Sequence, residues 1–488
     1  TPILISSLGK YEYGIWVVIG QIISFLLIAD LGVSSSVGRL IAKYDALNSI
    51  DKKISIYSSA LLIFLFSVVV IALLVFLVMD SIPGLLKVNA EYSLITTNIF
   101  LIMTVNFILV FPLRVGRGLL QAAHRFDYID MVLTVGKVAQ VCIIFVLFYT
   151  QNISLLKLAW MMAIINVSTE VFIFIKAKLI YRDVFFDTKS VDFETFKEMF
   201  SLGGASLLQS VSGVLSQQGM VFLVGVFLGV LYVPLFSIPL LLLVILGSLV
   251  GKIGTSFMPA ASAYDSLYEV QKISNLSVYG ARYSFMLGAL IAVFICLYGE
   301  QLLTFWLPES EISGSDIDIM FTILMVVLIP FILARSNQGN KVILSSTGNH
   351  WLVSNGLFVM SIFSLVTTIL LVIFTELGVY CFAIGWVVKL FFGDYFLILY
   401  FLCRKYSINL KEYLFKVYLK PIIVVLPVIV LSFFVRNVFE GDGLLLLAIN
   451  SGLFFLISIV CVCVLGVEKS HMNILLTSNF ISGFSNRK

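Results

Sequence analysis

The sequence has little charge, little histidine and no recognisable cysteine pattern. Charged side chains make up 12% of its 488 residues, against about a quarter in an average soluble protein. It contains 3 histidines, which argues against a metal or proton site built from imidazole. Its 6 cysteines lie in or beside apolar runs without neighbouring ligands, so we expect them to be packing residues. We therefore expect no metal site and no cofactor.

The chain also lacks a long polar segment. Its longest polar stretches are residues 176–200 and 300–316, which leaves no room for a soluble catalytic domain. Any function must therefore reside among the apolar segments. We expect neither an enzyme nor a nucleic-acid-binding protein.

Apolar runs occupy most of the sequence instead. Thirteen of them are close to the roughly 20 residues that an α-helix needs to cross a membrane. They lie near 14–37, 56–79, 94–113, 131–150, 155–175, 201–228, 232–251, 279–299, 317–334, 351–375, 378–402, 418–436 and 443–466. The opening residues TPILISS are typical of the end of one more apolar helix, truncated in this numbering, which brings the expected number to about 14. The sequence predicts an all-α polytopic membrane protein.

Lysine and arginine are distributed unevenly among the loops. When the loops are taken alternately, one set contains 26 of the 31 Lys and Arg residues, among them Arg114, Arg117 and Lys137. The opposite set is poor in cations and contains Lys10 and an acidic loop at 300–318. Because positive residues concentrate on the cytoplasmic side of membrane proteins, we expect the cation-rich loops and both termini to be cytoplasmic.

Two segments repeat at an offset of 220 residues. LGKYEYG at 8–14 and AKYDAL at 42–47 correspond to LGVLYVP at 228–234 and SAYDSL at 262–267. A second match, at an offset of 221, relates Arg114-x-x-Arg117-Gly118 to Arg335-x-x-Gln338-Gly339. Six helices separate the matching spans, so both run in the same direction. A parallel repeat of this kind indicates two lobes with a substrate site between them.

The repeat defines the expected domains. Residues 1–178 form an N-terminal lobe of six helices, the first incomplete, and residues 179–200 form a cytoplasmic loop. Residues 201–403 form a C-terminal lobe of six helices, and residues 404–488 form two additional helices and a cytoplasmic tail.

Several cations lie at or inside the ends of the apolar runs. Arg114 and Arg117 are three residues apart and therefore share a helix face. They can anchor a helix end by reaching lipid phosphates, or they can line a cavity and bind an anion. The recurrence of Arg335 in the second half favours the cavity. The candidate anion-binding residues are Arg39, Arg114, Arg117, Lys252, Arg335 and Lys389.

Three acids also lie within apolar runs, where contact with lipid would be costly. Asp30 and Glu170 are candidates for coupling transport to an ion or for neutralising nearby cations. Asp394 is a candidate partner for Lys389, which lies near the middle of the run 378–402.

The stretch LGKYEYGIWVVIGQIISFLLIADLGVSSSVGRLIAKY, residues 8–44, resembles the N-terminal signature of the Wzx-type polysaccharide-biosynthesis flippases, members of the MOP exporter superfamily. The matching elements are Leu8-Gly9, Tyr13-Gly14, Asp30-Leu31-Gly32 and Arg39. LLQAAHRFDY, residues 119–128, adds to the resemblance. Many relatives carry an acid in the seventh helix, where this chain reads QQGM at 217–220. The coupling ion is therefore left open.

The resemblance implies a V-shaped cavity between two lobes and a cargo of undecaprenyl-pyrophosphate-linked oligosaccharide. Such proteins move this lipid from the cytoplasmic to the outer leaflet of the bacterial inner membrane by alternating access, for O-antigen, lipopolysaccharide or capsule synthesis. Transport would be coupled to protons, sodium or the membrane potential. Membrane lipids, a polysaccharide polymerase and chain-length proteins are the implied partners.

Two other functions on the same fold stay open. A lipid II flippase handles a cargo of the same chemistry. A MATE-like drug or cation antiporter would favour acidic and aromatic cavity residues, whereas the candidates here are mainly basic. A polysaccharide polymerase would need large external loops rich in arginine and histidine, which this chain lacks.

Overall fold

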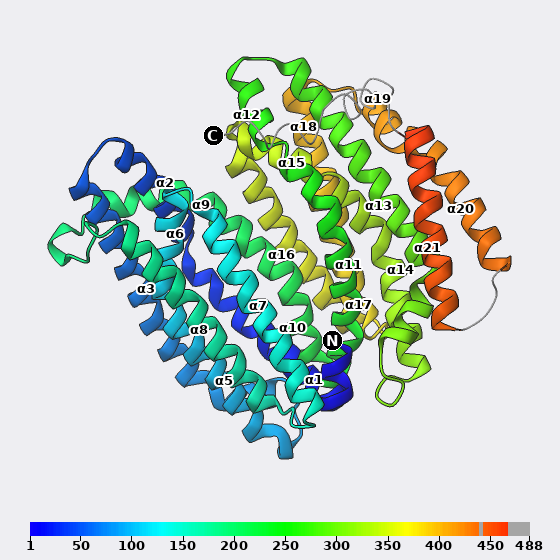
Figure 1. Ribbon diagram of the computed structural model, residues 1–488, viewed down its shortest axis with the longest axis horizontal. Helices are drawn as coiled ribbons and strands as arrows, with labels where there is room; N and C mark the ends of the chain where they lie inside the picture. The colour runs from blue at the N-terminus through cyan, green and yellow to red at the C-terminus, as the bar shows by residue number, and fades with distance from the viewer. Residues whose placement is uncertain (439–442, 467–488) are drawn as a thin grey trace. The chain divides into compact units, whose positions relative to one another are not determined.

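The chain folds into helices. The computed structural model describes residues 1–438 and 443–466, and this part contains helices and turns but no strand (Figure 1). Twelve helical stretches in it are long and apolar enough to cross a membrane. The prediction of an all-α polytopic membrane protein is confirmed. The predicted cytoplasmic tail, with Lys469, Arg487 and Lys488, lies outside the described residues.

The first of two compact units comprises residues Thr1–Leu240, Leu307–Ile323 and Asn349–Lys389. Its helices are α1 (Pro2–Leu26), α2 (Val33–Ala46), α3 (Ile50–Val78), α4 (Ile82–Leu85), α5 (Ala90–Val110), α6 (Val115–Ala122), α7 (Phe126–Tyr149), α8 (Leu155–Ile180), α9 (Phe193–Gly213), α10 (Gly219–Phe227), α16 (His350–Phe374) and α17 (Tyr380–Val388). Two helices, α11 (Val233–Thr255) and α14 (Gly314–Ser336), contribute residues to both units.

The second unit comprises residues Leu241–Trp306, Leu324–Gly348 and the chain from Leu390 onward. Its own helices are α12 (Met258–Ser266), α13 (Val270–Trp306), α15 (Gln338–Leu344), α18 (Ile398–Tyr406), α19 (Leu410–Leu414), α20 (Lys420–Val438) and α21 (Leu444–Cys461). A π-helical segment, η8 (Lys389–Leu397), joins α17 to α18.

The compact units differ from the predicted lobes at 1–178 and 201–403. Helices α10, α16 and α17 lie within the predicted C-terminal lobe, and α9 begins in the predicted loop and continues into that lobe, yet all four belong to the first unit. The predicted lobes rest on the sequence repeat and not on compactness, so that division stays a prediction.

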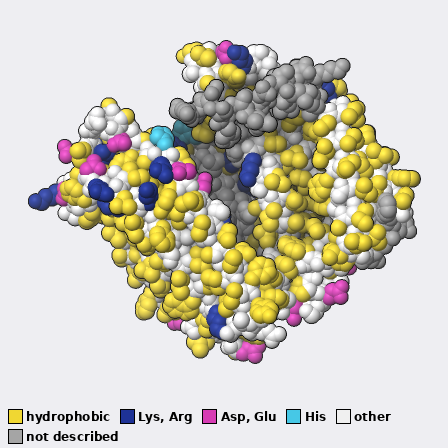
Figure 2. Space-filling view, viewed as in Figure 1, with side chains coloured by type: hydrophobic (Ala, Val, Ile, Leu, Met, Phe, Trp, Pro, Cys, Tyr) yellow, Lys and Arg dark blue, Asp and Glu magenta, His cyan; other side chains and the backbone are white. Residues whose placement is uncertain are grey.

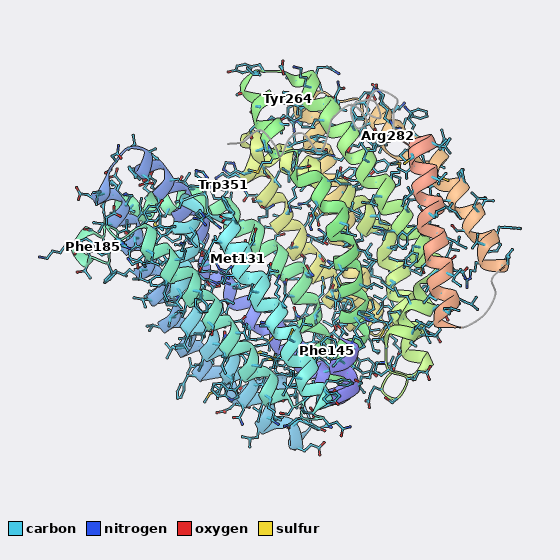
Figure 3. The ribbon with its side chains drawn as sticks, viewed as in Figure 1. Met131, Phe145, Phe185, Tyr264, Arg282 and Trp351 are labelled. Carbon is cyan, nitrogen blue, oxygen red and sulfur yellow. The ribbon has the colours of Figure 1, made fainter. Side chains whose placement is uncertain are left out.

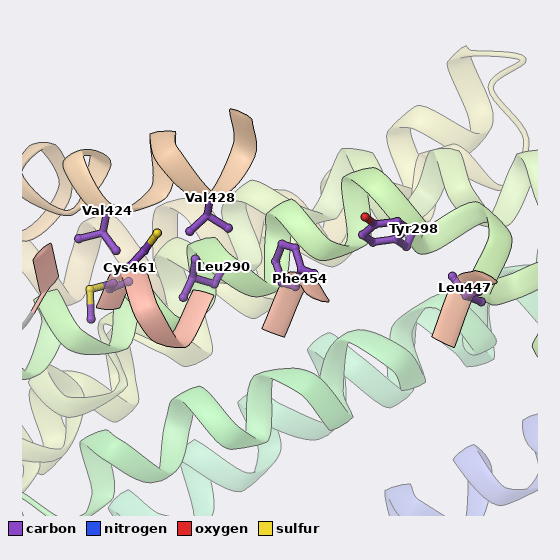
Figure 4. Packing of buried hydrophobic residues seen from close by; sticks show 8 residues of the cluster. Leu290, Tyr298, Val424, Val428, Leu447, Phe454 and Cys461 are labelled. Atoms are coloured by element: carbon purple, nitrogen blue, oxygen red, sulfur yellow. The ribbon is translucent and has the colours of Figure 1, made fainter. Parts of the chain in front are cut away.

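The two helices predicted to follow the repeat pack against α13. Leu290 and Tyr298 of α13 share a buried cluster with Val424 and Val428 of α20 and Phe454 of α21 (Figure 4). Lipid tails are as apolar as these side chains, so the cluster is stabilised by close van der Waals packing and not by removal from water. The interlocking shape of the side chains therefore fixes α20 and α21 to the second unit.

Most predicted spans fall inside single helices, but the span 14–37 is wrong in its second half. α1 ends at Leu26, a 3-10 turn η1 follows (Leu27–Asp30), and α2 begins only at Val33. Leu31 and Gly32 both have left-handed backbone, with φ of 52° and 75°, which ends a right-handed helix. The spans 317–334 and 351–375 lie together in one apolar stretch, Gly314–Phe374, which contains α14, α15 and α16.

The internal repeat is visible in the backbone. Gly9 has φ 75° and ψ 165°, and Gly229, 220 residues later, has φ 95° and ψ 166°, a region that is essentially restricted to glycine. The ends of α2 and α12 also match, because Asn48 and Tyr268 have φ of 54° and 56°. The same three backbone hydrogen bonds close both turns. These matches confirm the repeat at its predicted offset.

Ion pairs join residues that the charge analysis assigned to the same side. Lys10 donates to Asp316 over 2.7 Å, and both lie in the cation-poor set. In the cation-rich set, Lys43 pairs with Glu198 over 2.8 Å. Buried Lys53 bridges Asp45 and Asp183 over 2.9 and 3.2 Å. The predicted alternation of sides is therefore consistent with the contacts within the first unit.

Large apolar side chains cover much of the protein surface. Figure 2 shows hydrophobic side chains over most of the visible face. On α3, Phe66, Val69, Phe76 and Leu77 are each about two-thirds exposed. An apolar surface of this extent marks a protein that contacts lipid. The protein is a multi-pass membrane protein.

Candidate functional site

A polar cavity of about 310 Å³ lies within the first unit, among α1, α5, α6, α7 and α8. The middle of α1 and the apolar residues of α5 form much of its wall. Its polar lining side chains are Ser24, Asn106, Arg114, Arg117, Asn166, Thr169 and Glu170. The cavity therefore contains three of the residues singled out from the sequence: Arg114, Arg117 and Glu170.

The sequence around Pro112 places both arginines at this cavity. α5 ends at Val110, and the 3-10 turn η3 (Pro112–Arg114) leads into α6, since proline cannot donate the hydrogen bond that a continuing helix needs. Glycines then allow α6 to approach its neighbours. A Cβ on Gly116 would lie 2.9 Å from the Phe174 backbone of α8, and one on Gly118 would lie 2.6 Å from Val37 of α2.

Arg117 and Glu170 form a bidentate ion pair in the cavity wall. The Arg117 Nε donates to Glu170 Oε2 over 3.1 Å, and its Nη2 donates to Oε1. The Glu170 side chain is 3% exposed and that of Arg117 is 28% exposed. A carboxylate this deeply buried needs a cation beside it. Of the two roles predicted for Glu170, the geometry supports neutralising a nearby cation.

Arg114 is the cation of the cavity that no carboxylate binds directly. Its Nε is buried and has no hydrogen-bond partner among the described residues. Glu170 and Asp30 attract the guanidinium, and Arg117 repels it. Because Arg117 and Glu170 cancel, the lining carries a net charge of about one positive unit. A guanidinium with an unused buried donor at a cavity is suited to bind a phosphate oxygen.

Asp30 holds the break between α1 and α2. Its carboxylate accepts hydrogen bonds from the Ser34 backbone N–H over 3.0 Å and from the Ser34 hydroxyl over 2.9 Å. Next to it, Gly32 approaches α9 so closely that a Cβ would lie 2.3 Å from the Gly203 carbonyl oxygen. The signature Asp30-Leu31-Gly32 therefore separates α1 from α2. Asp30 also contributes negative potential at Arg114.

Arg335 is the matching residue of the second unit, and the pocket that it lines among the described residues is much smaller. The Arg335 guanidinium lies 4.8 Å from the centre of the Phe331 ring. The enclosed space beside it is only about 10 Å³, about the least that a single water requires. Asp394, in η8, attracts Arg335 electrostatically. Arg114 and Arg335 thus occupy matching places in the repeat but different surroundings.

The remaining predicted cations are not among the lining residues of the cavity. Arg39 is exposed on α2 and makes no hydrogen bond or ion pair within the described part of the chain. Lys252 is exposed near the end of α11. Lys389 is half-buried at the start of η8. None of the three lines the cavity with Arg114.

The two asparagines of the cavity were not predicted from the sequence. Asn106 is buried on α5 and donates to the Ala163 carbonyl over 3.5 Å. Asn166 on α8 accepts from Gln140 of α7 over 3.5 Å. The available signal was an uncharged amide in the middle of an apolar run, which interhelical hydrogen bonding commonly explains.

Solved structures share the fold of this chain at low sequence identity. An inward-facing multidrug resistance MATE family transporter of the MOP superfamily matches with a TM-score of 0.73 and 15% identity, over 83% of this chain and 93% of that chain. An outward-facing one matches with a TM-score of 0.62 and 16% identity, over 83% and 90%. A MOP superfamily transporter from Pyrococcus furiosus, described as having a binding pocket of reverse polarity that suggests a different function, matches with a TM-score of 0.59 and 16% identity, over 81% and 90%.

Comparison of the sequence with known sequences and family models identifies the family. No curated protein sequence matches the chain significantly. The family model described as polysaccharide biosynthesis protein matches residues 1–265, which is more than half of the chain and includes every residue of the cavity. This protein is therefore a member of the polysaccharide biosynthesis protein family with the fold of the MOP-superfamily membrane transporters.

Proposed function

We propose that the protein is a flippase that moves an undecaprenyl-pyrophosphate-linked oligosaccharide from the cytoplasmic to the outer leaflet of the bacterial inner membrane, for surface polysaccharide synthesis. Membership of the polysaccharide biosynthesis family and a transporter fold support this proposal. The headgroup of such a lipid is polar and anionic, whereas its chain is apolar. A helical membrane protein with a shielded cationic cavity suits that combination.

The proposal rests mainly on the buried, unpartnered Nε of Arg114. Arg114 places an unused guanidinium donor in a cavity whose other cation is already neutralised by Glu170. A cavity for cationic drugs would require the opposite balance, with a carboxylate left without a cation. The Pyrococcus furiosus transporter, described as having a pocket of reverse polarity, gives a precedent on this fold for reading function from cavity charge.

The direction of transport follows from the membrane potential. An inside-negative potential favours outward movement of negative charge by about 2.3 kcal/mol per charge per 100 mV. Cations that bind the headgroup only partly offset that charge in transit. We propose that both termini are cytoplasmic, as the loop charges indicate, so that the headgroup enters from the side on which it is assembled.

Replacing Arg114 with glutamine is expected to abolish ligand-induced stabilisation. Ligand at a hundred times its dissociation constant stabilises a protein by about 2.7 kcal/mol, and a hundredfold loss of affinity reduces this to about 0.4 kcal/mol. The measurement is the apparent melting temperature in detergent with undecaprenyl diphosphate, undecaprenyl phosphate, lipid II or cationic drugs. Wild-type protein should respond to the diphosphate, and Arg114→Gln should not.

Arg125→Gln is the matched control, because Arg125 is exposed and already paired with Asp127 over 3.0 Å. It removes the same charge and should retain the full shift. Stabilisation by cationic drugs alone would identify an antiporter and contradict the proposal. A much larger response to lipid II than to other diphosphate lipids would assign the protein to peptidoglycan synthesis.

A further inference from the structure

Helix α7 carries a lysine that the charge analysis placed in a loop. α7 has 24 residues and begins at Phe126, so Lys137 lies about 16 Å along a helix of about 36 Å. It is the only charged residue between Asp130 and Lys157. Counting it with the cytoplasmic loops was wrong, because it lies inside α7 and inside the predicted span 131–150.

The face of α7 that carries Lys137 is the face next to the cavity. Leu133, four residues earlier, lines the cavity. Gln140, three residues later, donates to Asn166, which also lines it. Residues at i−4, i and i+3 lie on one helix face. Lys137 is therefore the next position along the cavity side of α7.

Lys137 does not itself line the cavity, but helix geometry places its side chain next to a residue that does. Long side chains in α-helices extend back over the preceding turn, which for Lys137 is the turn that contains Leu133. The side chain is exposed, and it makes no hydrogen bond or ion pair within the described residues. A lone ammonium facing lipid at this depth would be costly. A position beside a polar cavity avoids that cost.

The opposite face of α7 is apolar. Met131, Val135 and Ala139 border a groove against Phe172 of α8 that is almost entirely apolar. Met131 and Phe145, both more than half exposed, stand on the same helix (Figure 3). α7 thus separates an apolar side, suited to lipid, from a polar side with Lys137 and Gln140.

We propose that Lys137, beside Gln140 and Asn166, is a second anion-binding residue of this site and that it makes the site prefer a diphosphate to a monophosphate. This inference rests on the proposed function. Arg114 binds one phosphate group through its planar guanidinium, and the flexible Lys137 ammonium contacts the second phosphate group, which carries the additional charge. Lysine suits this second contact because it acts as a point charge without a fixed hydrogen-bonding plane.

The test compares the affinities of wild-type protein, Lys137→Gln and Lys137→Arg in detergent for undecaprenyl diphosphate, undecaprenyl phosphate and inorganic diphosphate. We expect Lys137→Gln to lose about tenfold in affinity for the diphosphate lipid, equivalent to about 1.4 kcal/mol, and less than about twofold for the monophosphate. Inorganic diphosphate, used as a competitor, should lose the same factor as the lipid. Lys137→Arg should keep most of the preference.

Lys157→Gln is the matched control, because Lys157 is exposed, lies near the start of α8 and bonds to Asn152 instead of facing the cavity. Equal losses for both lipids in Lys137→Gln, or none for either, would overturn the inference. So would a loss with the diphosphate lipid that inorganic diphosphate does not show, because it would exclude a contact with the anion. In each case, abolished binding in Arg114→Gln would leave the proposed function standing. Unchanged binding in Arg114→Gln would instead contradict the proposed function itself.

Discussion

Replacing Arg117 with glutamine is expected to destabilise the protein by about 3 kcal/mol, because it leaves Glu170 as a buried carboxylate without its cation. The Glu170 side chain is only 3% exposed, so water replaces few of the lost hydrogen bonds. The reverse change, Glu170→Gln, should cost less, because Arg117 is 28% exposed and retains some contact with water. The measurement is the apparent melting temperature of each variant without ligand.

The double variant Arg117→Gln/Glu170→Gln distinguishes this explanation from a simple loss of packing. Two neutral amides can bond to each other, so the double variant should recover most of the stability lost in Arg117→Gln. Additive losses would show that the pair does not interact as the structure indicates. Glu170→Gln should also strengthen binding of a diphosphate lipid, since it adds one positive charge to the cavity.

Replacing Gly32 with alanine is expected to cost about 2–5 kcal/mol and to prevent much of the protein from folding. Two effects combine here. Gly32 has φ of 75°, where an L-residue costs roughly 1–2 kcal/mol. Its Cβ would also lie 2.3 Å from the Gly203 carbonyl oxygen, and backbone shifts forced by overpacking cost typically about 1–3 kcal/mol. Yield of folded protein and melting temperature both report the loss.

Two further glycines provide the controls. A Cβ on Gly203 would meet the Gly32 backbone at the same contact, but Gly203 has helical backbone in α9. Gly203→Ala should therefore show only the loss of stability that comes from overpacking. Gly213→Ala has nothing within 4 Å of its new Cβ and should be neutral or slightly stabilising. If Gly32→Ala had the same melting temperature as the wild type, the close approach of α2 to α9 would be disproved.

The sequence was sufficient to predict the elements that depend on local composition. Long apolar runs gave the helices, because a backbone in lipid must satisfy its own hydrogen bonds. The offset of 220 residues located the repeat, and the backbone at Gly9 and Gly229 confirms it. The break within 14–37 was missed, although its cause is local. Asp30 was interpreted as an ion-coupling or charge-neutralising residue, and Gly32 as part of the family signature, rather than as the end of a helix.

The candidate site was only partly predictable. Arg114 and Arg117 were selected because they share a helix face, and both line the cavity. Arg39, Lys252 and Lys389 were selected by residue type and position, and none of them lines it. Lys137 was counted with the cytoplasmic loops although it lies inside the predicted span 131–150.

The sequence by itself determined that this is a helical membrane protein with an internal repeat, and it predicted a basic functional site. Those properties follow from composition and spacing, which act along the chain. The tertiary structure alone decided which charges cancel. Arg117 and Glu170 are 53 residues apart yet share two hydrogen bonds, whereas Arg114, on the same turn of chain, keeps an unused buried donor. Charges interact through distance and burial in space, so only the folded chain separates the neutralised arginine from the one that can bind an anion.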